Sequence, residues 1–222
     1  MKSQAEVFEY PGSSPRLIGA EWDVTDEVRL RDELLEAKAL AESRYAGLKS
    51  AQAELERAAL YDYLTELPNR RFLEQTMAER RELGKKGNQG QAALHLDLDY
   101  FKEINDTLGH AAGDVMLRHV ADVLRASVRN GDFIARIGGD EFVILCALDG
   151  GTDDLTAMAD RILRALGQPV SYEGQAMQVG GSIGIAYERG SGLVTRHLLH
   201  EADVAMYRAK TGGRNRYELS LH

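Results

Sequence analysis

Residues 136–142 read Arg-Ile-Gly-Gly-Asp-Glu-Phe, and the apolar stretches 133–137 and 142–145 on either side of the glycine pair have the composition of β-strands. Because glycine adopts the positive φ angles of a primed turn at little cost, this stretch predicts a tight β-hairpin. Asp140 and Glu141, directly after the glycines, lower strand propensity and crowd two negative charges. These two carboxylates therefore require either solvent or a chemical role.

Composition limits the classes of function. The 222 residues are 44% hydrophobic, which suffices for one packed domain with an extension. A net charge of -8 and a pI near 5.3 disfavour nucleic acid and acidic membranes as partners. The one cysteine, Cys146, lies in an apolar run and fits a reducing cytoplasm, so we expect a cytoplasmic location. No apolar run of about 18 residues and no basic-then-apolar leader is present, so we expect neither a membrane span nor secretion.

Three regions differ in their sequence pattern: residues 1–23, 24–60 and 61–222. The first is turn-rich, contains one short strand-like stretch, and is too short for a domain. The second has one glycine and no proline, and it predicts a long helix. Residues three and four apart form a narrow stripe in which only Arg44 is polar: Leu30, Leu34, Ala37, Ala41, Arg44, Leu48, Ala51, Leu55 and Ala58.

This narrow stripe is typical of a coiled coil, and a parallel homodimer is the simplest arrangement that buries it. The alternative is a helix that packs back on its own domain, which usually shows a wider apolar face.

In residues 61–222, helix-type and strand-type segments alternate, which indicates an α/β (α+β) domain. Because two strands are joined by a tight hairpin, the central sheet must be partly antiparallel, and we expect a mixed sheet flanked by helices. The expected helices lie near 69–83, 100–109, 113–129, 154–166 and 195–210, and the expected strands near 92–98, 132–148 and 178–187.

A second group of carboxylates precedes the hairpin. By strand alternation, His95, Asp97 and Asp99 share one face, and the intervening leucines share the other. Asp97 and Asp140 on neighbouring strands would form a Mg²⁺ site, because hard divalent cations take carboxylate oxygens. For Asp99 we expect a different role, as the N-cap of the helix that starts at Tyr100.

Two cationic groups accompany these acids. Lys102 lies at the predicted helix start, where free N–H groups and the helix dipole favour phosphate. Lys210 and Arg214 lie four apart across the glycine pair that ends the last helix. Such a pair is usually a solvated helix end, but beside a metal site in an acidic chain it indicates a triphosphate.

Four separated motifs resemble one known family in order and spacing: DYLTELPNRR, DLDYFKEINDTLGHAAGD, RIGGDEF and AKTGGRN. Over roughly residues 61–218 the chain resembles the GGDEF domain of diguanylate cyclases. The resemblance implies a fold similar to the palm of class III nucleotide cyclases and the joining of two GTP molecules into cyclic di-GMP. Each of two domains would hold one GTP, and the domains would face each other in a homodimer.

The resemblance assigns the metal ligands and the catalytic acids. Asp97, the backbone carbonyl of Leu98 and Asp140 would bind two Mg²⁺ or Mn²⁺ ions per active site. Glu141 would assist the metal site or the deprotonation of the ribose 3'-hydroxyl. Such ions lower the pKa of the attacking hydroxyl and stabilise the leaving pyrophosphate.

The resemblance also assigns residues to GTP. Gly138 and Gly139 would let the backbone approach the nucleotide. The Asn105 amide and the Asp114 carboxylate would read guanine. The phosphates would be contacted by Phe101, Lys102, Lys210 and Arg214.

Arg129 and Asp132 bracket an Arg-Asn-Gly-Asp stretch, and five residues separate Asp132 from Gly138. On its own this pattern would most often be a helix end followed by a turn. Its offset resembles the inhibitory site of many diguanylate cyclases, in which arginine pairs with the guanine of bound cyclic di-GMP. Arg161 matches a second arginine that can complete this site from a neighbouring domain. We therefore expect non-competitive product inhibition.

Two features concern regulation. The family usually has glycine where Glu66 follows Thr65, and this element is expected to couple the incoming helix to the domain. Residues 1–23, through Asp23-Val24-Thr25, resemble the last strand of a PAS sensor domain, and a disordered leader with a helix cap is the alternative.

Two other classes of function remain open. One is a non-catalytic module that binds GTP or cyclic di-GMP, and the other is a structural dimerisation protein. The second would account for the long helix but not for the carboxylates. The intact acidic residues and glycines of the signature favour the enzyme over the first.

Overall fold

The computed structural model describes residues 2–9, 11–12, 14, 16–84, 90–148, 151–188 and 196–220. The chain divides into two compact units, Met1–Glu56 and Arg57–His222.

The first unit begins with an antiparallel hairpin. Strands β1 (Lys2–Phe8) and β2 (Arg16–Trp22) pair along their whole length. Helix α1 (Thr25–Leu60) follows after Asp23, whose carboxylate accepts hydrogen bonds from the N–H (2.9 Å) and the hydroxyl (2.6 Å) of Thr25. Asp23 therefore caps the helix start, which accounts for the Asp-x-Thr element locally.

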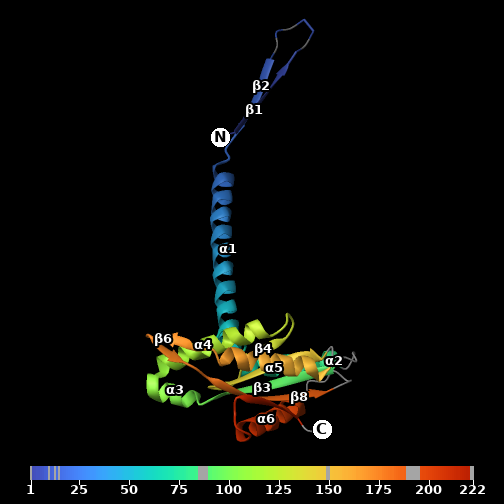
Figure 1. Ribbon diagram of the computed structural model, residues 1–222. Helices are drawn as coiled ribbons and strands as arrows, with labels where there is room; N and C mark the ends of the chain where they lie inside the picture. The colour runs from blue at the N-terminus through green and yellow to red at the C-terminus, as the bar shows by residue number, and fades with distance from the viewer. Residues whose placement is uncertain are drawn as a thin grey trace. The chain divides into compact units, whose positions relative to one another are not determined.

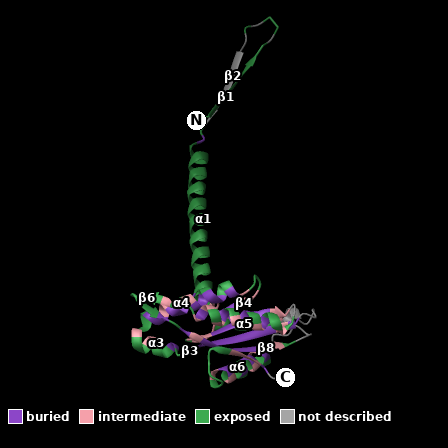
Figure 2. Ribbon diagram, in the orientation of Figure 1, coloured by how far each residue is buried: buried purple, intermediate pink, exposed green. Residues whose placement is uncertain are grey.

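Helix α1 has no buried residue, although its sequence contains the predicted apolar stripe. Leu30, Leu34, Leu48 and Leu55 are each 68–71% exposed, and the helix is green along most of its length in Figure 2. Leucines at helical spacing that find no cover within this unit leave apolar surface for a partner.

The second unit is built on one five-stranded sheet with the strand order β4-β5-β3-β8-β9. All neighbours pair antiparallel except β8 and β9, which are parallel, so the predicted mixed sheet is confirmed. The strands are β3 (Gly90–Asp99), β4 (Phe133–Arg136), β5 (Glu141–Leu148), β8 (Gly180–Glu188) and β9 (Arg216–Leu219).

Helices cover both faces of this sheet (Figure 1). Helices α3, α4 and α5 pack over the larger apolar core, and α2 and α6 cover the opposite face. Their bounds are Arg70–Gly84 for α2, Phe101–Leu108 for α3, His110–Ser127 for α4, Thr152–Leu166 for α5 and Arg196–Thr211 for α6.

The alternation of β3 sets which face receives the acids. Leu94, Leu96 and Leu98 are at most 2% exposed and belong to the core beneath α4 and α5. Burying each of them contributes about 2 kcal/mol, and a one-residue slip would turn all three away from the core. The leucines therefore force Asp97 and Asp99 onto the face that α6 covers.

The structure corrects the predicted glycine turn. Neither Gly138 nor Gly139 has a positive φ angle, and the link between β4 and β5 is four residues long and closed by a hydrogen bond from the Ile137 N–H to the Glu141 carbonyl (2.9 Å). A four-residue link does not need the left-handed backbone of a two-residue primed turn.

Three short strands had not been predicted in this unit. Strands β6 (Val170–Tyr172) and β7 (Gln175–Met177) form a small hairpin, and β9 adds a parallel edge strand to the main sheet. Segments of three or four residues are too short for alternation to reveal.

Among the described residues, no helix combines the length and the apolar character that crossing a membrane requires.

Gly184 of β8 provides a test of the packing between the sheet and α6. A Cβ at this position would overlap the Ala202 carbonyl oxygen and the Met206 amide nitrogen, so we expect Gly184→Ala to lower the free energy of unfolding by about 3 kcal/mol. Gly139→Ala is the matched control, because no atom lies within 4 Å of its added Cβ. Chemical denaturation would measure both, and equal stabilities would contradict this packing.

Candidate active site

The predicted acids meet at one end of the sheet. Asp97 of β3 lies directly across from Glu141 of β5, and the carbonyl of Asp140 accepts a hydrogen bond from the N–H of Leu98 (3.2 Å). The Lys210 Nζ atom, from the last turn of α6, lies 2.7 Å from the Asp97 Oδ2 atom. Four residues that sequence analysis assigned to one site are thus brought together from three elements.

The local field shows how strongly these acids interact. Burial raises the pKa of Asp97, and the charges of Asp140 and Glu141 raise it further, whereas the hydrogen bond and charge of Lys210 lower it. Asp97 is buried and has two acidic neighbours, so one lysine compensates its negative charge only in part.

This donor set fits a hard divalent cation. Two carboxylates and a backbone carbonyl at the end of adjacent strands are the oxygen ligands that such ions take. No group of three or more histidine, cysteine or acidic side chains that could hold a metal ion occurs in the described part of the chain. A divalent cation at this site would therefore be bound by two carboxylates and one backbone carbonyl, and its remaining ligands would come from outside the protein.

Asp99 does not cap a helix, so that prediction was wrong. Its Oδ1 atom accepts a hydrogen bond from the Ser182 hydroxyl (2.7 Å), and its Oδ2 atom accepts one from the Asn215 N–H (2.8 Å). Helix α3 begins after Tyr100, which has a φ of 60°, and no side chain caps it. Asp99 instead anchors the segment that follows α6 to the central strand, because strand alternation points its side chain to that face.

The predicted phosphate residues surround this anchor. The Arg214 guanidinium lies 4.9 Å from the centre of the Tyr100 ring, and both residues have left-handed backbone conformations. Lys102 is exposed in the first turn of α3, and the Phe101 side chain is buried in the core. Phe101 can therefore face a phosphate only through its backbone N–H.

Asn105 and Asp114 come from consecutive helices. The Asn105 side chain of α3 lies directly over the Cα atom of Gly113 in α4, where an added Cβ would overlap its Oδ1 atom. A glycine is needed here because two helices approach closely, and this approach brings the Asn105 amide beside the residue that precedes Asp114.

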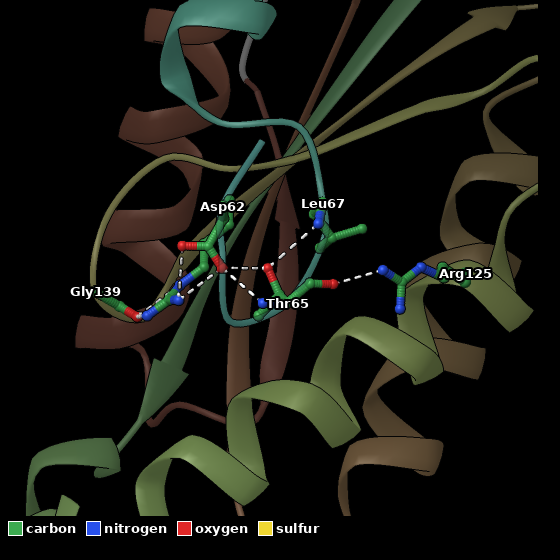
Figure 3. A network of polar contacts seen from close by, with 6 residues as sticks. Asp62, Thr65, Leu67, Arg125 and Gly139 are labelled. Carbon is green, nitrogen blue, oxygen red and sulfur yellow. Dashed lines mark hydrogen bonds and ion pairs between the residues drawn. The ribbon is translucent and has the colours of Figure 1, made fainter. Parts of the chain in front are cut away.

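Arg136 ties the signature turn to the turn after α1 (Figure 3). Its Nη1 atom lies 3.0 and 3.1 Å from the two carboxylate oxygens of Asp62, while its Nε and Nη2 atoms donate to the Gly139 carbonyl at 3.2 and 2.7 Å. Asp62 also accepts hydrogen bonds from the Thr65 N–H (2.8 Å) and hydroxyl (2.6 Å). The carbonyl that precedes Asp140 is thus held by a side chain bound to residues 62–65.

Sequence reasoning gave Arg136 no role, nor Ser182 and Asn215. An arginine at the end of a strand, two residues before a glycine pair, is the only signal in the sequence for the first. Nothing local indicates the other two, because their partner Asp99 is distant in the chain.

Glu66 occupies a left-handed conformation, with a φ of 54°. Glycine adopts this conformation at least cost, which gives a physical reason for the residue that the family usually has there. The Glu66 carboxylate lies 3.2 Å from Arg57 at the end of α1, and both side chains are exposed. An exposed pair of this kind contributes little stability.

Arg129, Asp132 and Arg161 line one cavity of about 120 Å³ within a single chain. Asp132 accepts a hydrogen bond from the Arg129 N–H (2.9 Å), the Arg129 guanidinium lies 3.1 Å from Asp154, and Arg161 donates to the Ser127 carbonyl at 2.5 Å. The second arginine of the predicted inhibitory site therefore lies beside the first without a neighbouring domain.

The Asp62 contacts predict a pH-dependent loss of stability. Although burial raises the pKa of Asp62, the hydrogen bonds from Thr65 and Arg136 outweigh it and hold the pKa below its usual value. Asp62 therefore stabilises the fold above about pH 4, and this contribution disappears as the pH falls through the lowered pKa.

We expect Asp62→Asn to lower the free energy of unfolding by about 2 kcal/mol at pH 7, with a difference from the parent that shrinks below about pH 4. Asp122→Asn, which removes an exposed pair with Arg125, should change it by less than about 1 kcal/mol. Denaturation at several pH values would check this, and a loss independent of pH would refute the role of the carboxylate.

The chain is similar in sequence to known diguanylate cyclases. The bifunctional diguanylate cyclase/cyclic di-GMP phosphodiesterase MucR of Pseudomonas aeruginosa is 41% identical over 170 residues, which are 77% of this chain and 25% of that protein. The diguanylate cyclase TpbB of the same species is 38% identical over 180 residues, covering 81% of this chain and 41% of TpbB. The chain thus spans well under half the length of these relatives.

Solved structures show the same fold. The GGDEF domain of TpbB superimposes with a TM-score of 0.66 at 37% identity, covering 72% of this chain and 94% of that one. The coiled coil and GGDEF domain of DgcB from Caulobacter crescentus, in complex with c-di-GMP, gives a TM-score of 0.74 at 25% identity, with coverages of 86% and 98%. The family model "Diguanylate cyclase, GGDEF domain" matches residues 59–216. The chain therefore belongs to the GGDEF-domain diguanylate cyclase family.

Proposed function

We propose that this chain is a diguanylate cyclase that joins two GTP molecules into cyclic di-GMP with release of two pyrophosphates. The observation that carries the proposal is the meeting of Asp97, Asp140 and Glu141 with Lys210 at the end of the sheet. The relatives MucR and TpbB, which carry this activity in their names, support it.

Diguanylate cyclases of this family depend on a metal ion. We propose Mg²⁺ or Mn²⁺, two per active site, held by Asp97, Asp140 and the Leu98 carbonyl. When bound, such ions acidify the ribose 3'-hydroxyl and stabilise the charge of the leaving pyrophosphate.

The protein's own groups orient and neutralise the substrate. Lys210 pairs with Asp97 in this structure, and we propose that in the GTP complex it turns to phosphate oxygens, joined by Lys102 and Arg214. Glu141 stands beside Asp97 and is positioned to accept a proton from the attacking hydroxyl or to complete the metal site. These roles follow from charge and position at the end of the sheet.

The backbone of the turn before Asp140 and the helices α3 and α4 are proposed to hold the remaining parts of GTP, including the guanine base. The carbonyl held by Arg136 fixes the path of the chain at Gly138 and Gly139, so that the turn can pass close to the nucleotide. Asn105 and Asp114 are proposed to read guanine from the junction of α3 and α4.

One chain supplies half of the reaction, because the product contains two nucleotides. We propose that two copies assemble through α1 as a parallel coiled coil and present their bound GTP molecules to each other. The exposed leucine stripe of α1 supports this, since a second copy would cover it.

We further propose that the product inhibits the enzyme at the cavity of Arg129, Asp132 and Arg161. Two guanidinium groups at one cavity suit the O6 and N7 acceptors of guanine and the two phosphates of the ring.

The activity is tested by incubating the protein with GTP and Mg²⁺ and following cyclic di-GMP by chromatography. We expect product formation whose rate per chain rises with protein concentration, since the site needs two copies. Asp140→Ala should reduce the rate by at least about 100-fold. GTP binding without product at any protein concentration would favour a non-catalytic binding module.

Product inhibition is tested with Arg129→Ala. We expect the variant to keep the initial rate and to need at least about tenfold more cyclic di-GMP for half inhibition, because one guanine contact is lost. Arg164→Ala, which removes an exposed arginine elsewhere on α5, should inhibit like the parent. Unchanged sensitivity of Arg129→Ala would refute this site.

A further inference from the structure

A second cavity, of about 440 Å³, lies between the turn after α1 and helix α4. Leu64 and Tyr63 line it from the turn, and Asp114 and Arg118 line it from the helix. Arg125 closes one side by donating to the Thr65 carbonyl at 2.5 Å, a contact drawn in Figure 3. This contact fixes the turn against α4 at one side of the cavity.

Asp114 and Arg118 lie one helical turn apart and face this cavity without partners. Across the described residues, neither side chain makes a hydrogen bond or an ion pair, whereas Asp122 and Arg125 on the same helix pair at 2.9 Å. An acid and a base four apart on a helix commonly pair with each other. Because Asp114 and Arg118 do not pair, the carboxylate acceptors of one and the guanidinium donors of the other lie side by side at the cavity.

This arrangement matches the edges of guanine. A carboxylate accepts from the N1–H and the 2-amino group, and an arginine fork donates to the neighbouring O6 and N7 acceptors. Adenine would present an amino donor to the guanidinium donors and would leave the carboxylate without a partner. Asn105 is not part of the cavity lining and approaches from the side of Gly113.

We propose that Arg118 is a specificity-determining residue, which donates hydrogen bonds to the O6–N7 edge of the guanine of GTP while Asp114 accepts from the opposite side of O6. The Tyr63 ring, 91% exposed at the rim of the cavity, is available to stack on the base. This inference rests on the proposed function, and it adds a residue that neither motif nor spacing had indicated.

Arg118→Ala in the full chain tests the proposal. The side chain is exposed and has no partner among the residues that the structure describes, so the variant should fold with the thermal stability of the parent. We expect its KM for GTP to rise by about tenfold or more with an unchanged kcat, and its preference for GTP over ATP to fall. Arg164→Ala, an exposed arginine on α5, is the matched control and should keep the parental KM.

Nucleotide analogues locate the contact. Inhibition constants against GTP turnover are measured for 7-deaza-GTP, which lacks the N7 acceptor, and for 2-aminopurine riboside triphosphate, which lacks both O6 and the N1 proton. If Arg118 reads this edge, the loss of affinity caused by Arg118→Ala is smaller for each analogue than for GTP, because each analogue lacks one of the two acceptors of the guanidinium. Arg118→Lys keeps the positive charge but loses the planar guanidinium fork, so its KM for GTP should be closer to that of Arg118→Ala than to that of the parent.

Three outcomes would overturn the proposal: a penalty of the same size with GTP and both analogues, a KM no higher than that of Arg164→Ala, or full restoration by lysine. If the parent forms no product, the proposed activity fails instead. Equilibrium titration with GTP and the analogues then still decides the role of Arg118 in base recognition.

Discussion

The contact of the Arg136 Nη1 atom with both carboxylate oxygens of Asp62, extended through Nε and Nη2 to the Gly139 carbonyl, is the interaction on which the organisation of the site depends. The two side chains are only 12% and 18% exposed, so the pair is largely removed from water and the loss of either partner would leave a charge without compensation. Through it, the backbone beside Asp140 is positioned by residues 62–65, which follow directly on the long helix. Arg125 of α4 holds this turn at the Thr65 carbonyl, so both the turn before Asp140 and helix α4 are tied to residues 62–65.

A balance of charge organises the rest of the site. The central strand brings Asp97 and Asp99 to one face because its three leucines occupy the other, and each acid then has a partner in the C-terminal part of the chain. Lys210 pairs with Asp97, and the Asn215 N–H binds Asp99 together with the Ser182 hydroxyl. The segment that carries Lys210 and Arg214 is thereby fixed beside the acids, which is the arrangement that a triphosphate bound through metal ions requires.

Much of the fold was predictable because its longer elements have strong periodic patterns. The central strand, the hairpin strands and the helices beside them were expected near their observed positions. Two predictions failed for different reasons. Asp99 was expected to cap its own helix, but its partners Ser182 and Asn215 lie far away in the chain. The glycine pair was expected to need positive φ angles, but the link between β4 and β5 is four residues long. Strands β6, β7 and β9 were missed because three or four residues carry no measurable alternation, and the edge strand depends on parallel pairing with β8.

Motif order and strand alternation were enough to predict the family, the acidic residues and the strand face of Asp97 and Asp99, because these patterns are local properties of the chain. The apolar stripe of the long helix was visible in the same way. Which charges meet could not be predicted, because it depends on contacts between distant parts of the chain. The contacts of Arg136 with Asp62, of Lys210 with Asp97 and of Asp99 with Asn215 join residues more than 70 positions apart. The packing of α6 onto Gly184 likewise depends on a close approach of two backbones that no local pattern records. The cavity that Asp114 and Arg118 line likewise exists only because the turn after α1 packs against α4, which the sequence does not show.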